Sequence, residues 1–354
     1  MMPFSDDLKS HLHQLETDDR NLADWPAKQL KLLFDSGFGR FGIPEEYGGM
    51  LISARESAEF YVNLSTHTLP TAFILSQRQA CLGRLVASEN TSLKEEFLPQ
   101  LASGELMTTV GISHLSTSRQ HLGRPAVTAE QTEDGYLLNG EIPWVTGGPF
   151  ADVLLLGATL ADQTEILLLV DRQTDGLRVN PPMELLALTN TATGTLTLKD
   201  VRIPQSRLVL GPTTGVMKSG SGGTGSFATS ALAIGVALRA IEELQIEARS
   251  RDYLQPFADQ LHAEGDQLHL DLLTASEDPD QTSLTPAGLR SRANSLVLRS
   301  TQALLTASKG AGFTQGHLAE RLVRQSFFFL VWSCPGPVAN AAMQQFACTS
   351  EGFE

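Results

Sequence analysis

An aromatic side chain, a β-branched residue, a hydroxyl and two glycines follow one another in the middle of the chain: Trp144, Val145, Thr146, Gly147 and Gly148. Such a set suits a flat heterocycle lying against a β-sheet. The indole can stack on the ring, the hydroxyl and a backbone N–H can bond its edge, and glycine lets the backbone come close. The segment is equally compatible with a tryptophan buried in a β-barrel core beside a hairpin turn.

The elements before this segment have helical spacing. Apolar residues recur three and four apart over residues 22–38, where the pattern ends at glycines, and again over residues 53–101. Pro44 and the pair Gly48-Gly49 mark a loop between these two regions. We therefore expect the first hundred residues to be helical.

From about Met107 the pattern changes to short apolar runs between polar turns, which is typical of an antiparallel barrel or sandwich. The strand that begins at Gly135 is expected to reach a turn after Asn139, and Asp134-Gly135 predicts a hairpin turn before it. The predicted strands cover residues 126–129, 135–138, 153–158, 165–170 and 195–198.

A Gly/Ser-rich stretch over residues 219–226 predicts a linker, and helical spacing follows it to about Trp332 with a polar interruption at 276–288. Pro335 and Pro337 are expected to end the last long helix. The predicted fold is α+β: an N-terminal helical domain (1–106), a central antiparallel β-barrel or sandwich (107–216) and a C-terminal four-helix bundle (217–354).

Motifs stand in a fixed order along nearly the whole chain, in segments 41–49 (FGIPEEYGG), 97–113, 137–158, 195–212, 231–244 and 310–325. Together they resemble the acyl-CoA dehydrogenase family. None is specific alone, but six in the correct order are not expected by chance. The resemblance implies the same helix–sheet–helix order, FAD as cofactor, and a dimer or tetramer with the flavin at a subunit boundary.

The resemblance also implies flavin contacts. Trp144, Val145 and Thr146 match the family's Trp-Ile-Thr type of triplet, and Ser113 stands where the family places a threonine that contacts the isoalloxazine ring. A serine keeps the hydroxyl. Taken alone, Ser113 is equally well explained as a capping or loop serine.

Two positions correspond to family contacts with the rest of FAD. Arg251 falls at the spacing of an arginine that reaches the pyrophosphate bound by the adjacent subunit, where its planar guanidinium suits phosphate. The Phe-Gly that usually follows is replaced near Leu254, and a surface arginine on a charged helix is the alternative. The turn at Gly310 would let a helix terminus approach the adenosine part, and Thr306 stands where the family often has glutamine.

The family's catalytic base is missing. In the family, FAD accepts a hydride from an acyl thioester while a carboxylate removes the α-proton. Ser333 occupies the slot of that carboxylate, followed by Cys334, and Gly225-Ser226 occupy the alternative slot. A serine without a histidine partner cannot act as base, and a cysteine could do so only as thiolate. Glu351 in the tail is another carboxylate that could enter the site, and the catalytic residue stays unknown.

The substrate side is altered too. The family's Glu-Pro-Gly-Ala-Gly-Ser-Asp loop is replaced over residues 114–125, and Ile142 stands where a lysine is common. An anionic or unusual substrate would suit a basic loop, although a solvated loop is the reading that we favour. The basic residues of the loop are His114, Arg119, His121 and Arg124.

Composition narrows the class of protein. The 354 residues carry a formal net charge of −14, which argues against a nucleic-acid partner but leaves room for coenzyme A or FAD in a local basic pocket. The start of the chain has no apolar signal core, and no apolar run is long enough for a membrane span. Cys81, Cys334 and Cys348 are too few and too scattered for a disulfide framework or a metal site. We expect a cytoplasmic protein.

The leading hypothesis is an FAD-dependent oxidoreductase acting on an acyl thioester or related compound, as a homodimer or homotetramer. One alternative is a flavin monooxygenase or oxidase on the same fold, whose chemistry does not need the missing carboxylate. Another is a non-catalytic descendant that keeps the scaffold for interactions. Whether the chain is an enzyme stays open at this point.

Overall fold

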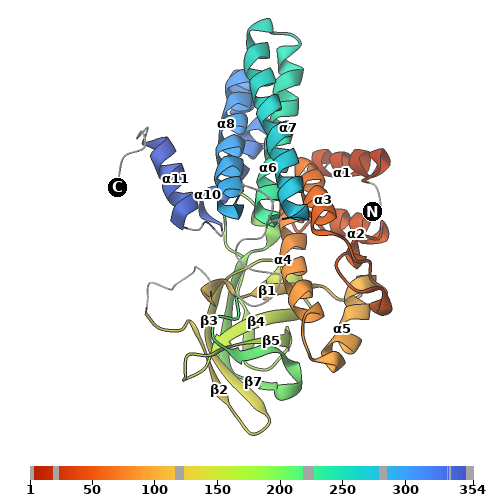
Figure 1. The fold of residues 1–354 in the computed structure, drawn as a ribbon, viewed down its shortest axis with the longest axis vertical. Helices are drawn as coiled ribbons and strands as arrows, with labels where there is room; N and C mark the ends of the chain where they lie inside the picture. The colour runs from red at the N-terminus through yellow and green to blue at the C-terminus, as the bar shows by residue number, and fades with distance from the viewer. Residues whose placement is uncertain are drawn as a thin grey trace.

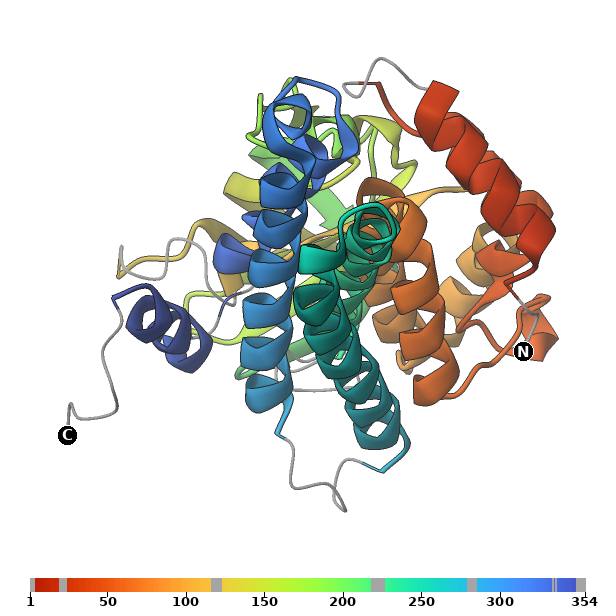
Figure 2. The ribbon, with the colours of Figure 1, turned by 90° about the horizontal axis from the view of Figure 1, so that it is seen from above.

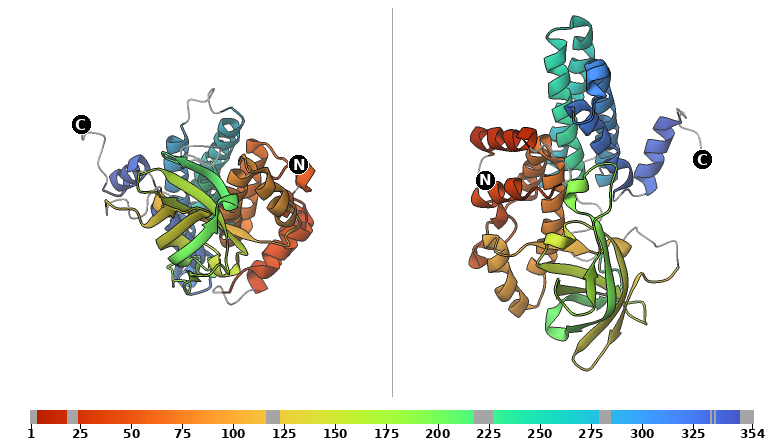
Figure 3. Two further views of the ribbon diagram at one scale, coloured as in Figure 1. Left: turned by 90° about the horizontal axis from the view of Figure 1, so that it is seen from below. Right: turned by 180° about the vertical axis from the view of Figure 1, so that it is seen from behind.

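Helices form both ends of the chain and a β-sheet forms its middle, the order that the sequence predicts (Figure 1). This computed structural model describes residues 4–18, 24–115, 123–217, 227–278, 285–332, 334 and 336–347, so the predicted linker at 219–226 lies outside it. The sheet lies at one end of the molecule, the long C-terminal helices reach to the other end, and the N-terminal helices lie on one flank (Figures 1 and 3).

The N-terminal helices end where glycine and proline require it. Pro26 precedes α2, and Gly37, with a φ of 85°, follows its end, so this helix is shorter than the pattern over 22–38 predicts. Ser53 and Glu56 form a capping box at the start of α3. The elements are α1 (Asp6–Asp18), α2 (Ala27–Asp35), η1 (Phe38–Arg40), η2 (Glu45–Tyr47), α3 (Ala54–His67), α4 (Leu69–Val86) and α5 (Thr91–Ser103).

The described part of the middle segment forms one eight-stranded sheet, with the order β6-β7-β3-β2-β4-β5-β8 and with β1 paired to β4. The predicted hairpin at Asp134-Gly135 is present between β2 and β3. The strands are β1 (Thr108–Gly111), β2 (Val127–Gln131), β3 (Gly135–Val145), β4 (Val153–Thr159), β5 (Glu165–Asp171), β6 (Leu177–Val179), β7 (Gly194–Pro204) and β8 (Leu208–Thr213).

Two details of the sheet differ from the prediction. The pairs β1–β4 and β2–β4 are parallel, because alternation along a strand fixes which face is apolar but not the direction of the neighbour. No turn follows Asn139. A register shift occurs there instead, and at Gly140, with a φ of 139°, a Cβ would overlap the carbonyl oxygen of Ala126. Between Val201 and Leu198 β7 has one more residue than β3 has opposite it, so the Asn-Gly pair lies opposite a β-bulge in β7.

The long C-terminal helices run side by side, as the view from above shows (Figure 2). The helical run ends at Val331, close to the predicted end at Trp332, but a further helix follows it, and Pro337 lies in the first turn of that helix, α11, where proline is tolerated. α11 packs against α8 and projects away from the other helices (Figures 1 and 3). The helices are α6 (Ala228–Ala248), α7 (Gln255–Glu277), α8 (Pro286–Gly312), α9 (Leu318–Ser326), α10 (Phe328–Val331) and α11 (Gly336–Phe346).

Apolar packing joins the three parts. Leu154 and Leu156 of β4 belong to a core inside the sheet, whereas Leu155 between them packs with α4 and α5. Both faces of β4 are therefore buried, which explains its continuous apolar run. None of the helices among the described residues is long and apolar enough to cross a membrane, and no group of three or more His, Cys, Asp or Glu in that part of the chain is arranged to hold a metal ion.

Gly235 lets α6 cross close to α3. A Cβ at this position would overlap the Ser65 hydroxyl and the carbonyl oxygen of Val62. Gly265 in α7 is also covered, but there a Cβ would meet only side-chain ends, at 3.1 Å from Leu238 and 3.2 Å from Ile241. A methyl group at Gly235 would thus collide with backbone, which cannot move aside, whereas one at Gly265 would meet only flexible side chains.

Gly235→Ala is expected to lower the free energy of unfolding by about 2 kcal/mol or more, because overpacking against backbone outweighs the better helix propensity of alanine. Gly265→Ala is the matched control and should stay within about 1 kcal/mol of the wild type. Chemical denaturation measures both variants. Equal stabilities would show that α3 and α6 can separate without cost.

Candidate functional site

Ser113 and the Trp144 triplet lie together at the end of β3. The Ser113 hydroxyl, at the start of η3 (Ser113–Leu115), donates to the carbonyl oxygen of Pro143 at 2.7 Å, across 30 residues of sequence. The Thr109 hydroxyl in β1 donates to the carbonyl oxygen of Thr146, also at 2.7 Å. β1 and η3 are thus fastened to β3 on both sides of Trp144.

Trp144 is held in an uncommon conformation. Its φ of 58° lies in the left-handed region, where a bulky side chain is strained, and 42% of its surface is exposed. The alternative of a tryptophan buried in the barrel core is therefore wrong. Strained non-glycine residues persist where the surrounding structure fixes them, and they cluster at functional sites.

Val145 and Thr146 are buried beside Trp144. The side chain of Val145 packs in the core of the sheet, so this residue could meet a ligand only through its backbone. The Thr146 hydroxyl lies 3.1 Å from that of Thr193, which in turn lies 2.8 Å from that of Thr191. Sequence reasoning missed Thr191 and Thr193, although the threonine-rich run over 189–197 signals a hydroxyl cluster.

Arg251 and Gly310 lie near each other. Arg251 donates to the carbonyl oxygen of Ala307 at 2.6 Å and pairs with Glu247. Gly310 follows a kink in α8 at Lys309, whose φ is 53°, and a Cβ on Gly310 would meet open space. The arginine therefore anchors the helix just before the predicted glycine turn.

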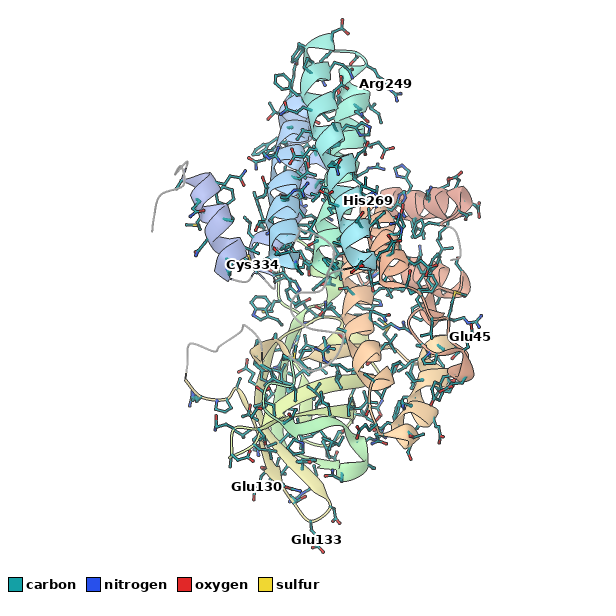
Figure 4. The ribbon with its side chains drawn as sticks, in the orientation of Figure 1. Glu45, Glu130, Glu133, Arg249, His269 and Cys334 are labelled. Atoms are coloured by element: carbon teal, nitrogen blue, oxygen red, sulfur yellow. The ribbon has the colours of Figure 1, made fainter. Side chains whose placement is uncertain are left out.

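Within one chain, Arg251 and Gly310 are remote from the group formed by Ser113, Trp144 and Thr146, which we call the Trp144 cluster. Arg249, two residues before Arg251, is labelled at the end of the C-terminal helices that lies farthest from the sheet (Figure 4). Ser113, Trp144 and Thr146 belong to the sheet. The fold thus divides the predicted site residues between two places.

The structure describes little of the positions at which a catalytic base was sought. Ser333, Gly225, Ser226 and Glu351 all lie outside the described residues. Burial raises the pKa of the Cys334 thiol above its ordinary value, although the nearby charge of Arg290 opposes the rise. Cys334 is therefore protonated at neutral pH and is excluded as the base.

The substituted loop is also described only in part, because Arg119 and His121 lie outside the described residues. His114 is buried, with its Nε2 atom 3.1 Å from the carbonyl oxygen of Gly157, so it does not belong to a solvated basic face as expected. Arg124 is exposed, and Ile142, at the family's lysine position, is fully buried in the sheet core.

Comparisons with known proteins agree with the motif order. Residues 5–105 match the family model described as acyl-CoA dehydrogenase, N-terminal domain. A probable acyl-CoA dehydrogenase of Bacillus subtilis (strain 168) is 26% identical over 225 residues, which cover 59% of this chain and 34% of the relative. The chain spans between 32% and 62% of the length of the curated relatives that it matches.

Solved structures share the fold over almost the whole chain. The glutaryl-coenzyme A dehydrogenase complex with glutaryl-CoA has a TM-score of 0.82 at 18% identity, covering 98% of this chain and 97% of that chain. Dibenzothiophene monooxygenase from Paenibacillus sp. A11-2 has a TM-score of 0.78 at 18% identity, covering 96% and 94%. At this identity the likeness establishes the fold, which hosts more than one chemistry.

Trp144→Gly is expected to be more stable than Trp144→Ala by about 1 kcal/mol, because glycine removes the Cβ clash of the left-handed region and alanine keeps it. Urea denaturation of the two variants measures the difference. The same pair of changes at Leu186, exposed by 64% and not among the positive-φ residues, should give the opposite order. Equal stability of the Trp144 pair would show that this backbone is not strained.

Proposed function

We propose that this chain, which belongs to the acyl-CoA dehydrogenase family, is an FAD-dependent oxidoreductase. The observation that carries the proposal is the grouping of Trp144 with the Ser113 and Thr146 hydroxyls at one end of β3, where the indole is exposed on strained backbone.

The chemistry of these side chains fits FAD. Trp144 offers a flat apolar face, and Ser113 and Thr146 offer hydroxyl oxygens to the edge of a ring. Arg251 has five N–H donors, so its bonds to Glu247 and Ala307 leave donors for a phosphate. Bound FAD would supply the redox chemistry, whereas these residues would bind and orient it.

The substrate that we propose is an acyl thioester or a related compound, in keeping with the family. A flavin monooxygenase or oxidase is the second candidate. Ser333 favours it, because oxygen activation at a flavin needs no carboxylate to remove an α-proton, and a monooxygenase is among the structures that share this fold. We also propose that residues 1–106, 107–216 and 217–354 are separate domains.

We propose that the protein works as a homodimer or homotetramer. Arg251 and Gly310 lie at the far end of the helices from the sheet, so they could serve the Trp144 cluster of another copy rather than their own (Figure 4). A second copy would then complete each site with a guanidinium group.

Purified protein is expected to be yellow, with a flavin absorbance spectrum. Trp144→Ala and Thr146→Val should each weaken flavin binding by up to about tenfold, because they remove a stacking face and a hydroxyl partner. Thr301→Val, which removes another buried hydroxyl in α8, is the control and should bind normally. If both site variants fold and keep full flavin content, the ring is not held here.

The wild type is expected to reduce its flavin slowly with straight-chain acyl-CoA, because general-base catalysis contributes about 10²–10⁴-fold to such steps. Ser333→Glu should speed anaerobic flavin reduction, followed by absorbance, whereas Ser333→Gln supplies the size without the charge and should not. Rapid reduction by the wild type would contradict the missing base. Turnover with oxygen but not with acyl-CoA would favour the second candidate.

Arg251→Met is expected to raise the Kd for FAD about tenfold, since a hydrogen bond to a charged group contributes about 1.5–3 kcal/mol. Arg249→Met, which changes an exposed arginine on the same turn, should leave the Kd unchanged. Sedimentation of the wild type at micromolar concentration should show an oligomer. A monomer that still holds FAD would refute the shared site.

A further inference from the structure

A chain of hydroxyl groups runs from Thr146 into the protein interior. The Oγ1 atoms of Thr146 and Thr193 are 3.1 Å apart, those of Thr193 and Thr191 are 2.8 Å apart, and Thr191 Oγ1 lies 2.8 Å from the carbonyl oxygen of Leu188. Thr146, Thr191 and Thr193 are each at most 2% exposed. Water therefore has little access to these groups, and the protons must be shared within the chain.

The direction of the hydrogen bonds follows from counting protons. Each hydroxyl has one proton, and a carbonyl oxygen can only accept. Two oxygens 2.8 Å apart need a proton between them, so Thr191 donates to Leu188. Thr193 must then donate to Thr191, and Thr146 must donate to Thr193. The Thr146 proton is then used toward Thr193, and only lone pairs of the Thr146 hydroxyl remain for another partner.

The inner end of this chain of hydroxyl groups, at Leu188, is fixed by strained backbone. The turn η6 (Thr189–Thr191) is flanked by Leu188 with a φ of 61° and Ala192 with a φ of 48°, both in the left-handed region. The carbonyl oxygen of Thr191 accepts the backbone N–H of Gly147 at 2.9 Å, which ties the turn to the triplet. The Leu188 carbonyl therefore cannot turn away, and the direction of the chain is built into the fold.

On the basis of the function proposed above, we propose that Thr191 and Thr193 make Thr146 an acceptor-only partner of the flavin and thereby favour its reduced form. A reduced isoalloxazine ring carries an N–H that the oxidised ring lacks. A hydroxyl that can only accept bonds this N–H but not the bare nitrogen of the oxidised ring. Thr191 and Thr193 are positioning residues, since they act through Thr146.

Thr191→Val tests the direction of the hydrogen bonds through a residue that acts on the flavin only by way of Thr193 and Thr146. Without the Thr191 hydroxyl, Thr193 can donate to Thr146, and Thr146 can donate outward to the oxidised ring. The reduced-to-oxidised ratio at a given potential is expected to fall about tenfold, which is about 30 mV for a two-electron couple. Thr193→Val should lower the midpoint potential in the same direction, and Thr191→Ser, which keeps a hydroxyl, should restore the wild-type value.

Thr301→Val is the matched control, because the Thr301 hydroxyl is also fully buried but bonds the carbonyl oxygen of Val297 within α8, outside the hydroxyl chain and away from the sheet. Its midpoint potential, measured by titration against a reference dye, should equal that of the wild type. Thr191→Val and Thr193→Val variants that contain flavin and have unchanged midpoint potentials would overturn this inference but not the proposed function. An equal fall in Thr301→Val would also overturn it, since general loosening on loss of a buried hydroxyl would then be the cause. A wild-type protein that takes up no flavin would overturn the proposed function, and the inference with it.

Discussion

The attachment of β1 and η3 to the end of β3 is the constraint on which the candidate site depends. Hydrogen bonds from Thr109 and Ser113 reach backbone carbonyl oxygens on either side of Trp144. Each such bond contributes about 0.5–1.5 kcal/mol, which together is comparable to the cost of a left-handed tryptophan. Without them the backbone would relax, and the indole would have no fixed direction.

The sheet holds this strained segment in place. β3 lies between β2 and β7, and the loop after Val145 is bonded to Thr191, so the triplet sits on rigid elements rather than on a free loop. In a site of this kind, the direction in which each side chain points matters for ligand binding as much as its distance from the ligand. A second register shift adds to this, because between Ile142 and Val145 β3 has one more residue than β7 and bulges at Trp144 itself.

Buried polar side chains of α8 hold the end of the C-terminal helices directly before position 333. The buried Arg290 and Asn294 of α8 donate to the carbonyl oxygens of Trp332 and Phe329, at 3.0 and 2.9 Å. Burial lowers the pKa of Arg290 to about 10, so it stays charged at neutral pH. Buried polar groups therefore hold the backbone in place directly before position 333.

The sequence by itself determined the order of helices and strands and the motif order of the family, because periodicity and short motifs are local properties. It also located Trp144, Ser113 and Thr146, which were expected to lie close together. The tertiary structure decided what local patterns do not encode: the parallel pairing of β1 and β2 with β4, the bulge of β7 opposite Asn139, the exposure of Trp144 and the burial of His114. It likewise decided that Thr193 reaches Thr146 across 47 residues, and that Arg249, two residues before Arg251, lies far from the sheet. These features depend on which distant segments pack together, and burial, hydrogen-bond direction and strain follow only from that packing.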